Sequence, residues 1–230
     1  MYKLNAYVSY MIIAFLIPFT LSCLKVDCKK NNGIVKDIDG NIYQTVIIGE
    51  QEWMAENLRT THLNDGTIIT EIKSNYQWFR NNSPAYCYYD NDTLYGRLHG
   101  ALYNWYTINT NKLCPVGWHV PNEEDWHVLI NFLGGIGTAG RLMKSREGWQ
   151  KAGNGNNESG FSGLPGGLRY SSSFFLHNGH YGYWWSYSRE KRSAFYLLYD
   201  YPYIFQSSFF PNYGLSVRCV KDNDDYCSEN

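Results

Sequence analysis

LCPVGWHVPNEEDWHVL, residues 113–129, holds one cysteine, two histidines, two tryptophans and three consecutive acidic residues. Nucleophilic and metal centres use these residue types, and so does a capped helix that lies beside a disulfide. Asn122 is a favourable N-cap residue, and Asp125 three positions later can complete a capping box. Glu123 and Glu124 fall in the first turn, where the helix dipole stabilises a carboxylate by about 0.3–1 kcal/mol. The segment therefore predicts the start of a helix.

The apolar residues that follow continue this helix. They recur at the i, i+3, i+4 and i+7 positions of one helix face: Trp126, Leu129, Ile130 and Leu133. Gly134 and Gly135 then predict the end of the helix, and TAGRLMKS, residues 138–145, predicts a second helical turn. His119 precedes the helix and His127 lies inside it, so the two cannot be assumed to share a face. We interpret both as structural rather than metal-binding.

Upstream, residues 37–58 (DIDGNIYQTVIIGEQEWMAENL) alternate apolar and polar side chains on both sides of a turn at Gly49 and Glu50. This pattern predicts short antiparallel strands. Residues 59–100 are polar and rich in turn residues, and GALYNWYTI, residues 100–108, is predicted as a short helix or strand.

Downstream, three aromatic-rich segments alternate well enough to be strands of one sheet. They are GYWWSYS, SAFYLLYDY and YGLSVRCVKD, at residues 182–188, 193–201 and 213–222. Strands and helices in this order predict a single α+β domain, for which 230 residues supply a sufficient core.

The composition argues against nucleic-acid binding and suggests ligand binding through aromatic rings. The net charge is −1, only 18% of residues are charged, and no cluster of Lys and Arg marks a nucleic-acid-binding surface. Aromatic residues make up 17% of the chain. Such a surplus of rings can leave a stacking surface exposed for a ligand.

The first residues are typical of an export signal. YMIIAFLIPFTLS, residues 10–22, is apolar, follows Lys3, and is too short for a transmembrane helix. The ending FTLSC resembles the lipobox of bacterial lipoproteins, so we expect lipidation of Cys23. We expect residues 1–22 to be a lipoprotein signal peptide and residues 23–35 a polar tether. The domain then covers residues 36–222, and residues 223–230 form a polar tail. A plain secretory signal and a retained anchor remain open, and all three readings place the chain outside the cytosol, anchored to the outer membrane or secreted.

An extracytoplasmic location permits disulfides. Beyond the lipidated cysteine, five remain: Cys28, Cys87, Cys114, Cys219 and Cys227. Because the number is odd, at least one of them is free or pairs with another molecule.

The sequence shows no assembled catalytic or metal centre. HNGH holds His177 and His180 in a predicted turn, but no third ligand is evident. The segment GFSG does not fit the nucleophile elbow of hydrolases. We therefore expect no catalytic residue, no metal and no cofactor.

Six blocks, read in order, resemble the Fibrobacter succinogenes major paralogous domain family: DIDGNIYQTVIIGEQEWMAENLR, LYNWYT, LCPVGWHVPNEEDWHVL, GFSGLPGGLRY, YWWSYS and GLSVRCVKD. The resemblance covers roughly residues 36–222. It implies a secreted or lipid-anchored protein of bacteria such as Fibrobacter and Bacteroidetes, in a family whose biochemical activity is undefined.

GWHVPNEEDW and GLSVRC are more distantly similar to blocks of the C-type-lectin-like fold, above all its formylglycine-generating branch. That resemblance implies short twisted antiparallel strands, one or two helices and long irregular loops. It also implies a disulfide between Cys114 and Cys219, with Cys87 as a competing partner. The redox cysteines of that branch have no counterpart in residues 184–218, and the calcium-binding triplets of sugar-binding C-type lectins are missing.

We therefore expect non-enzymatic binding of a polysaccharide or a surface protein through an aromatic-rich surface. The candidate ligand-binding residues are Tyr181, Tyr183, Trp184, Trp185, Tyr201 and Tyr203, with Tyr88 and Tyr89 as further candidates. Because strand residues alternate between faces, one of the two tryptophans can equally be core. Two other functions stay open: a purely structural surface protein, and an envelope enzyme with an unrecognised centre.

Overall fold

The computed structural model describes residues 33–172 and 174–223, which form one α+β unit with four sheets. The predicted α+β class is confirmed. Cys23, Cys28 and Cys227, with the signal peptide and almost all of the predicted tether and tail, lie outside the described residues. No helix in the described part of the chain is long and apolar enough to cross a membrane.

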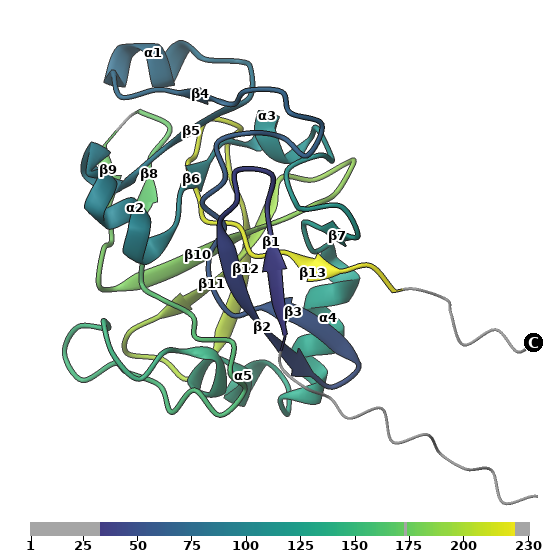
Figure 1. The fold of residues 1–230 in the computed structure, drawn as a ribbon. Helices are drawn as coiled ribbons and strands as arrows, with labels where there is room; N and C mark the ends of the chain where they lie inside the picture. The colour runs from purple at the N-terminus through teal and green to yellow at the C-terminus, as the bar shows by residue number, and fades with distance from the viewer. Residues whose placement is uncertain (1–32, 173, 224–230) are drawn as a thin grey trace, which may run out of the picture.

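The largest sheet brings the two ends of the domain together (Figure 1). Its strands, in spatial order, are β1 (Ile34–Lys36), β2 (Ile42–Ile48), β3 (Gln51–Met54), β13 (Val220–Lys221) and β7 (Trp118–His119). The antiparallel pairing of β2 with β3, through the turn at Gly49, is as predicted. The pairing of β1 with β2 was not predicted, because Ile34 and Val35 were assigned to the polar tether. Val46 and Val220 both lie opposite Trp53, and all three side chains are buried.

The predicted capped helix is confirmed as α4 (Glu123–Phe132). The Asn122 side chain accepts from the backbone N–H groups of Glu124 and Asp125, and Asp125 accepts from the N–H of Asn122. The four predicted apolar residues of this helix are all buried. The second predicted turn forms α5 (Ile136–Met143).

A second sheet of three antiparallel strands covers the other side of the same core. Its strands are β10 (Tyr181–Ser186), β11 (Ser193–Leu198) and β12 (Ile204–Ser208). Phe195 stacks on Trp126 of α4, with ring centroids 4.9 Å apart, and Trp126 in turn contacts Trp53 of β3. The aromatic surplus therefore fills much of the space between the two sheets and α4.

The remaining elements are short. The strands are β4 (Thr70–Glu71), β5 (Ala85–Cys87), β6 (Leu102–Tyr103), β8 (Leu168–Arg169) and β9 (Phe175–Leu176). The helices are α1 (Asn75–Arg80), η1 (Tyr89–Asn91), α2 (Thr93–His99) and α3 (Trp105–Ile108). Helices α1, η1 and α2 were not predicted, because helices of three to seven residues are too short to show an apolar period. Distant contacts hold them instead, such as the bond from Trp78 Nε1 to the carbonyl of Asn212, 2.7 Å long.

The prediction that YGLSVRCVKD belongs to one sheet with the two preceding segments is wrong. Only its Val220 and Lys221 form a strand, β13, and that strand belongs to the largest sheet. The carbonyls of Val217 and Cys219 accept from the N–H groups of Leu58 and Met54, which ties the segment to the end of β3. A single bridge from Ser216 to Trp184 is what joins it to β10.

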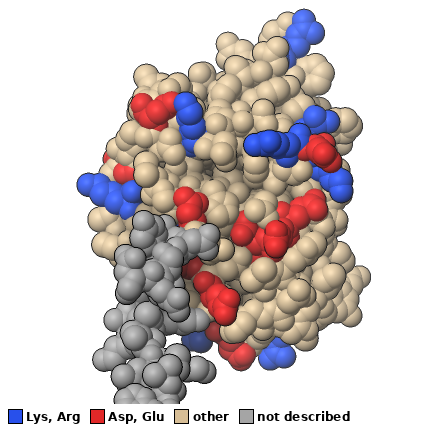
Figure 2. Space-filling model, turned by 90° about the vertical axis from the view of Figure 1, so that its right-hand side faces the viewer, with Lys and Arg blue, Asp and Glu red and all other residues tan. Residues whose placement is uncertain are grey.

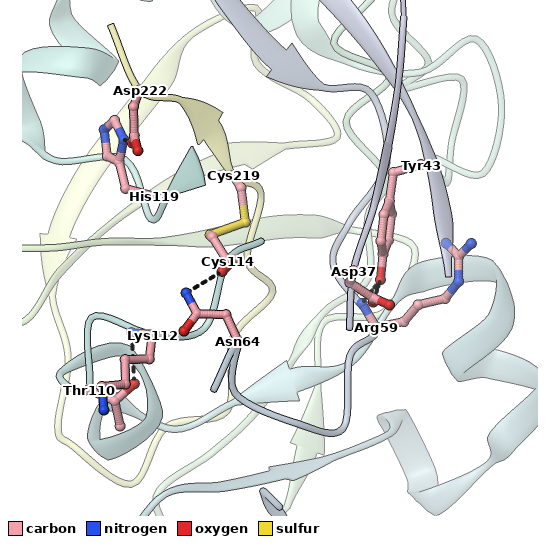
Figure 3. Close-up of a disulfide and its surroundings, with 10 residues drawn as sticks. All are labelled: Asp37, Tyr43, Arg59, Asn64, Thr110, Lys112, Cys114, His119, Cys219 and Asp222. Atoms are coloured by element: carbon pink, nitrogen blue, oxygen red, sulfur yellow. Dashed lines mark hydrogen bonds and ion pairs between the residues drawn. A yellow bond between two sulfur atoms is a disulfide. The ribbon is translucent and has the colours of Figure 1, made fainter. Parts of the chain in front are cut away.

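Cys114 and Cys219 form a disulfide across 105 residues of sequence, as the resemblance implied (Figure 3). The bond joins the segment before α4 to the segment before β13. Among the described cysteines, Cys87 is buried and not disulfide-bonded, so it does not compete for either partner.

Candidate functional site

The structure corrects three of the predicted ligand-binding residues. Trp184 and Trp185 are fully buried and Tyr183 is nearly so. Successive side chains of β10 do point to opposite faces, but both faces are covered. Trp184 packs against Phe161, and Trp185 packs against Trp105. The expectation that these three rings face a ligand is therefore wrong.

The other predicted rings differ in exposure. Tyr201 and Tyr203 are 45% and 42% exposed, and Tyr181 is half-buried. Tyr88 is also half-buried, whereas Tyr89 is buried in a separate small core cluster. Tyr201 and Tyr203 remain the best candidates for contact with a ligand.

These tyrosines belong to a continuous row of rings, which we call the aromatic strip: Tyr181, Tyr183, Tyr196, Phe205, Tyr203 and Tyr201. The centroids of Tyr183 and Tyr196, and of Tyr196 and Phe205, are both 5.4 Å apart. The strand register places Tyr183, Tyr196 and Phe205 opposite one another on β10, β11 and β12. Tyr196 and Phe205 were not predicted from the sequence, although the alternation in SAFYLLYDY is a signal that places Tyr196 on this face.

The rings inside the strip cover one another, and the rings at its end do not. Tyr196 and Phe205 are inclined by 21°, so each shields a face of its neighbour. Tyr201 and Tyr203 meet Phe205 edge-on, at 89° and 72°, and are inclined to each other by 33° at 6.1 Å. This exposed pair is the part of the strip that can accept a planar or ring-shaped partner.

The turn that carries the exposed pair is held from below by α5 and the residue that follows it. Lys144 is buried, and its ammonium donates to the carbonyls of Leu198, Tyr199 and Tyr201, each at 3.1 Å. The N–H of Arg141 donates to the carbonyl of Pro202 at 3.0 Å. Burial lowers the pKa of Lys144, and the three carbonyls occupy all three of its N–H donors. The pair is therefore held in place in the free protein.

Comparison with known proteins assigns the chain to a family. The Fibrobacter succinogenes major domain matches residues 46–221, which is more than half of the chain. The chain belongs to this family. Neither a curated protein nor a solved structure matches it.

The match to the Fibrobacter succinogenes major domain runs from β2 to β13 and includes the aromatic strip, α4 and the disulfide. These features therefore lie inside the family domain.

The family domain also carries an acidic groove of about 830 Å³ beside α4 and β13. Acidic side chains gather on this face of the molecule (Figure 2), and those that line the groove are Glu50, Glu52, Glu124, Asp125 and Asp222. His119 lies between two of them, with Nε2 3.0 Å from Asp125 and Nδ1 2.6 Å from Asp222. Figure 3 shows His119 beside Asp222.

Only a doubly protonated imidazole can donate to both carboxylates. Burial opposes protonation of His119, but the hydrogen bonds and charges of Asp125 and Asp222 outweigh it and raise the pKa of the ring. The role of His119, which the sequence left open, is to join the capped start of α4 to the end of β13.

The remaining predicted histidines have local roles. His177 Nδ1 lies 2.9 Å from the hydroxyl of Tyr183, and its ring stacks on Tyr181. His180 Nδ1 lies 3.1 Å from the carbonyl of Asn178. Within residues 33–172 and 174–223, no group of three or more His, Cys, Asp and Glu side chains could hold a metal ion.

Proposed function

We propose that this chain is an exported, lipid-anchored envelope protein that binds a polysaccharide, without catalysis, through the exposed end of the aromatic strip. The observation that carries the proposal is the pair Tyr201 and Tyr203, exposed at the end of the strip and fixed by the ammonium of Lys144. A sugar ring presents apolar C–H groups that pack on an aromatic face, and the tyrosine hydroxyls can bond to its rim. Because the turn is already ordered, binding costs little conformational entropy.

Export and anchoring at Cys23 are parts of the same proposal. The apolar segment of residues 10–22 supports export, and so does a disulfide, since such bonds persist mainly outside the cytosol. Metabolic labelling with a fatty acid tests the anchor directly. We expect label on the native chain and none on Cys23→Ser, whereas unlabelled native chain would exclude lipidation.

A C-type-lectin-like arrangement is the fold that we propose. It is supported by the pairing of β3 with the last strand, β13, and by the disulfide from Cys114 to Cys219. An experimental structure and a comparison of its topology with lectin-like domains would test it. A strand order incompatible with that fold would exclude it.

The binding proposal is tested with a panel of neutral oligosaccharides: cellohexaose, xylohexaose and laminarihexaose. We expect one of them to bind the native chain in calorimetry and the Tyr201→Ala/Tyr203→Ala variant to bind it about tenfold more weakly, a loss of about 1.4 kcal/mol. Tyr76→Ala is the matched control, because Tyr76 is exposed on α1, outside the strip. The proposal fails if no glycan of the panel binds, or if the double variant and the control bind equally well.

A further inference from the structure

A second groove, of about 400 Å³, lies between the end of β3, the end of α2 and the loops after α5, and it shares no residue with the aromatic strip. Its volume is within the range of about 300–1,000 Å³ that is usual for small-molecule sites. Its charged lining residues are Glu56, Arg59, Arg97, Arg146 and Glu147. We call it the arginine groove.

Two of its three arginines are available to a ligand. Arg59 is engaged by Glu56, with Nη1 and Oε2 3.1 Å apart. Arg97 is exposed, and its side chain forms no hydrogen bond or ion pair with another described residue. Arg146 is also exposed, and its one bond in the described chain runs from Nε to the carbonyl of Asn156, which leaves its terminal nitrogens free.

The floor of the groove rests on a buried cation. Asn57 lines the groove, and its Oδ1 accepts from Arg218 Nη2 at 2.7 Å. The same nitrogen of Arg218 lies 3.4 Å from the carbonyl of Ser162, a second lining residue. Arg218 is fully buried, with its guanidinium 4.1 Å from the ring centre of Phe161. A positive charge therefore lies directly beneath the floor.

This buried charge is only partly compensated. Nε and Nη1 of Arg218 have no acceptor among the described residues, and no carboxylate there forms an ion pair with it. Burial lowers the pKa of Arg218 to about 9, and the charge of Glu56 acts in the opposite direction. Because a buried guanidinium without a counter-ion is costly, an anion nearby is stabilised.

We propose that the arginine groove binds the carboxylate of an acidic saccharide, that is, a uronic acid unit. Arg97 and Arg146 at the rim contact the carboxylate directly. The positive charge of Arg218, beneath the floor of the groove, attracts the carboxylate electrostatically. Guanidinium groups suit this partner because their paired N–H donors match two carboxylate oxygens. This inference does not depend on binding at the aromatic strip.

The rest of the lining favours a singly charged sugar over a phosphate. Glu56 and Glu147 lie in the same groove and repel a dianion more strongly than a monoanion. Their oxygens can accept hydrogen bonds from hydroxyl groups instead. Leu98 and Leu164 supply apolar contact for the ring of the sugar.

The test measures the affinity of the full chain for trigalacturonate and for its methyl ester, which removes the charge and keeps the rings. We expect trigalacturonate to bind at least about tenfold more tightly than the ester. Arg97→Gln/Arg146→Gln should lose that difference, and Arg97→Lys/Arg146→Lys should recover part of it. Arg189→Gln is the control, since Arg189 is exposed and does not line the groove.

Three results would overturn the inference: equal affinity for acid and ester, no effect of the double glutamine variant, or stronger competition by inorganic phosphate than by free galacturonic acid. Loss of binding in Arg189→Gln as well would also overturn it, because the effect would then come from general surface charge. Because the rim arginines are exposed, these variants should fold normally. Binding of a neutral glycan and its dependence on Tyr201 and Tyr203 are measured separately, so the two proposals can fail independently.

Discussion

Asn57 and Arg218, 161 residues apart in sequence, are joined by a 2.7 Å hydrogen bond in the interior. The same amide oxygen accepts from Trp184 Nε1 at 2.8 Å, and the amide nitrogen donates to the carbonyl of His99. One short side chain therefore connects the end of β3, the end of α2, β10 and the segment before β13. Without it, Trp184 Nε1 has no acceptor among the described residues, and Arg218 Nη2 keeps only the longer bond to the carbonyl of Ser162.

Asn57→Leu is expected to lower the free energy of unfolding by about 3 kcal/mol, because it leaves a buried guanidinium and an indole N–H without their acceptor. Asn57→Asp should cost less, since a carboxylate still accepts from Arg218. Urea unfolding measures both, with the exposed Asn109→Ala as the control that stays within about 0.5 kcal/mol. An Asn57→Asp variant less stable than Asn57→Leu would contradict this account.

Replacing both Cys114 and Cys219 by serine is expected to cost up to about 4–5 kcal/mol, since the bond closes a loop of 105 residues in the unfolded chain. Denaturation with and without a reducing agent gives the same comparison in the native chain. Cys87 should not exchange with the disulfide, because burial raises the pKa of its thiol to about 12. Equal stability of the oxidised and reduced chains would show that the bond adds nothing to stability.

The ion pairs of His119 predict a pH dependence. Its folded pKa is raised, so the stabilisation is complete below the unfolded pKa of about 6.5 and is lost as the pH rises through the folded pKa. The expected loss is roughly 1 kcal/mol, because Asp222 is about half exposed and solvent screens its charge. His119→Gln should be less stable than the native chain at acidic pH and similar to it at alkaline pH. A constant difference across this range would exclude titration of His119 as the cause.

Lys144→Met is expected to lower stability by about 2–3 kcal/mol, because three carbonyls of the turn before β12 lose their donor. It should also weaken any ligand bound at Tyr201, since the turn is no longer fixed. Lys151→Met is the control: its ammonium lies 5.3 Å above the ring of Tyr199 at the surface, a contact of about 0.5–1 kcal/mol. Similar effects of the two substitutions would argue against a positioning role for Lys144.

Much of the fold could be predicted from local pattern. The capping residues Asn122 and Asp125 and the apolar spacing after them specify α4, because a helix start depends on neighbours three or four residues away. The hairpin of β2 and β3 follows in the same way from alternation on both sides of Gly49. The disulfide came from resemblance, since spacing alone leaves several pairings open.

The candidate site was predictable only in part. Tyr181, Tyr201 and Tyr203 of the aromatic strip were expected to be near a ligand and are at least partly exposed, but Tyr183 and the two tryptophans of β10 were placed with them and are core residues. Alternation predicts that successive side chains of a strand point to opposite faces, but it does not predict whether both faces are buried. Arg218 was not considered at all, because its burial depends on Phe161 and Asn57, each more than 50 residues away in sequence.

The sequence by itself determined the α+β class, the capped helix, the antiparallel strands at the start of the domain and a chain rich in aromatic rings. These depend on short-range periodicity and on propensity, which are local. Only the tertiary structure decided which rings are exposed, which sheet receives the last strand, and that Arg97, Arg146 and Arg218 converge on one groove. Those outcomes depend on packing between segments distant in sequence, and burial is a property of that packing rather than of any single residue.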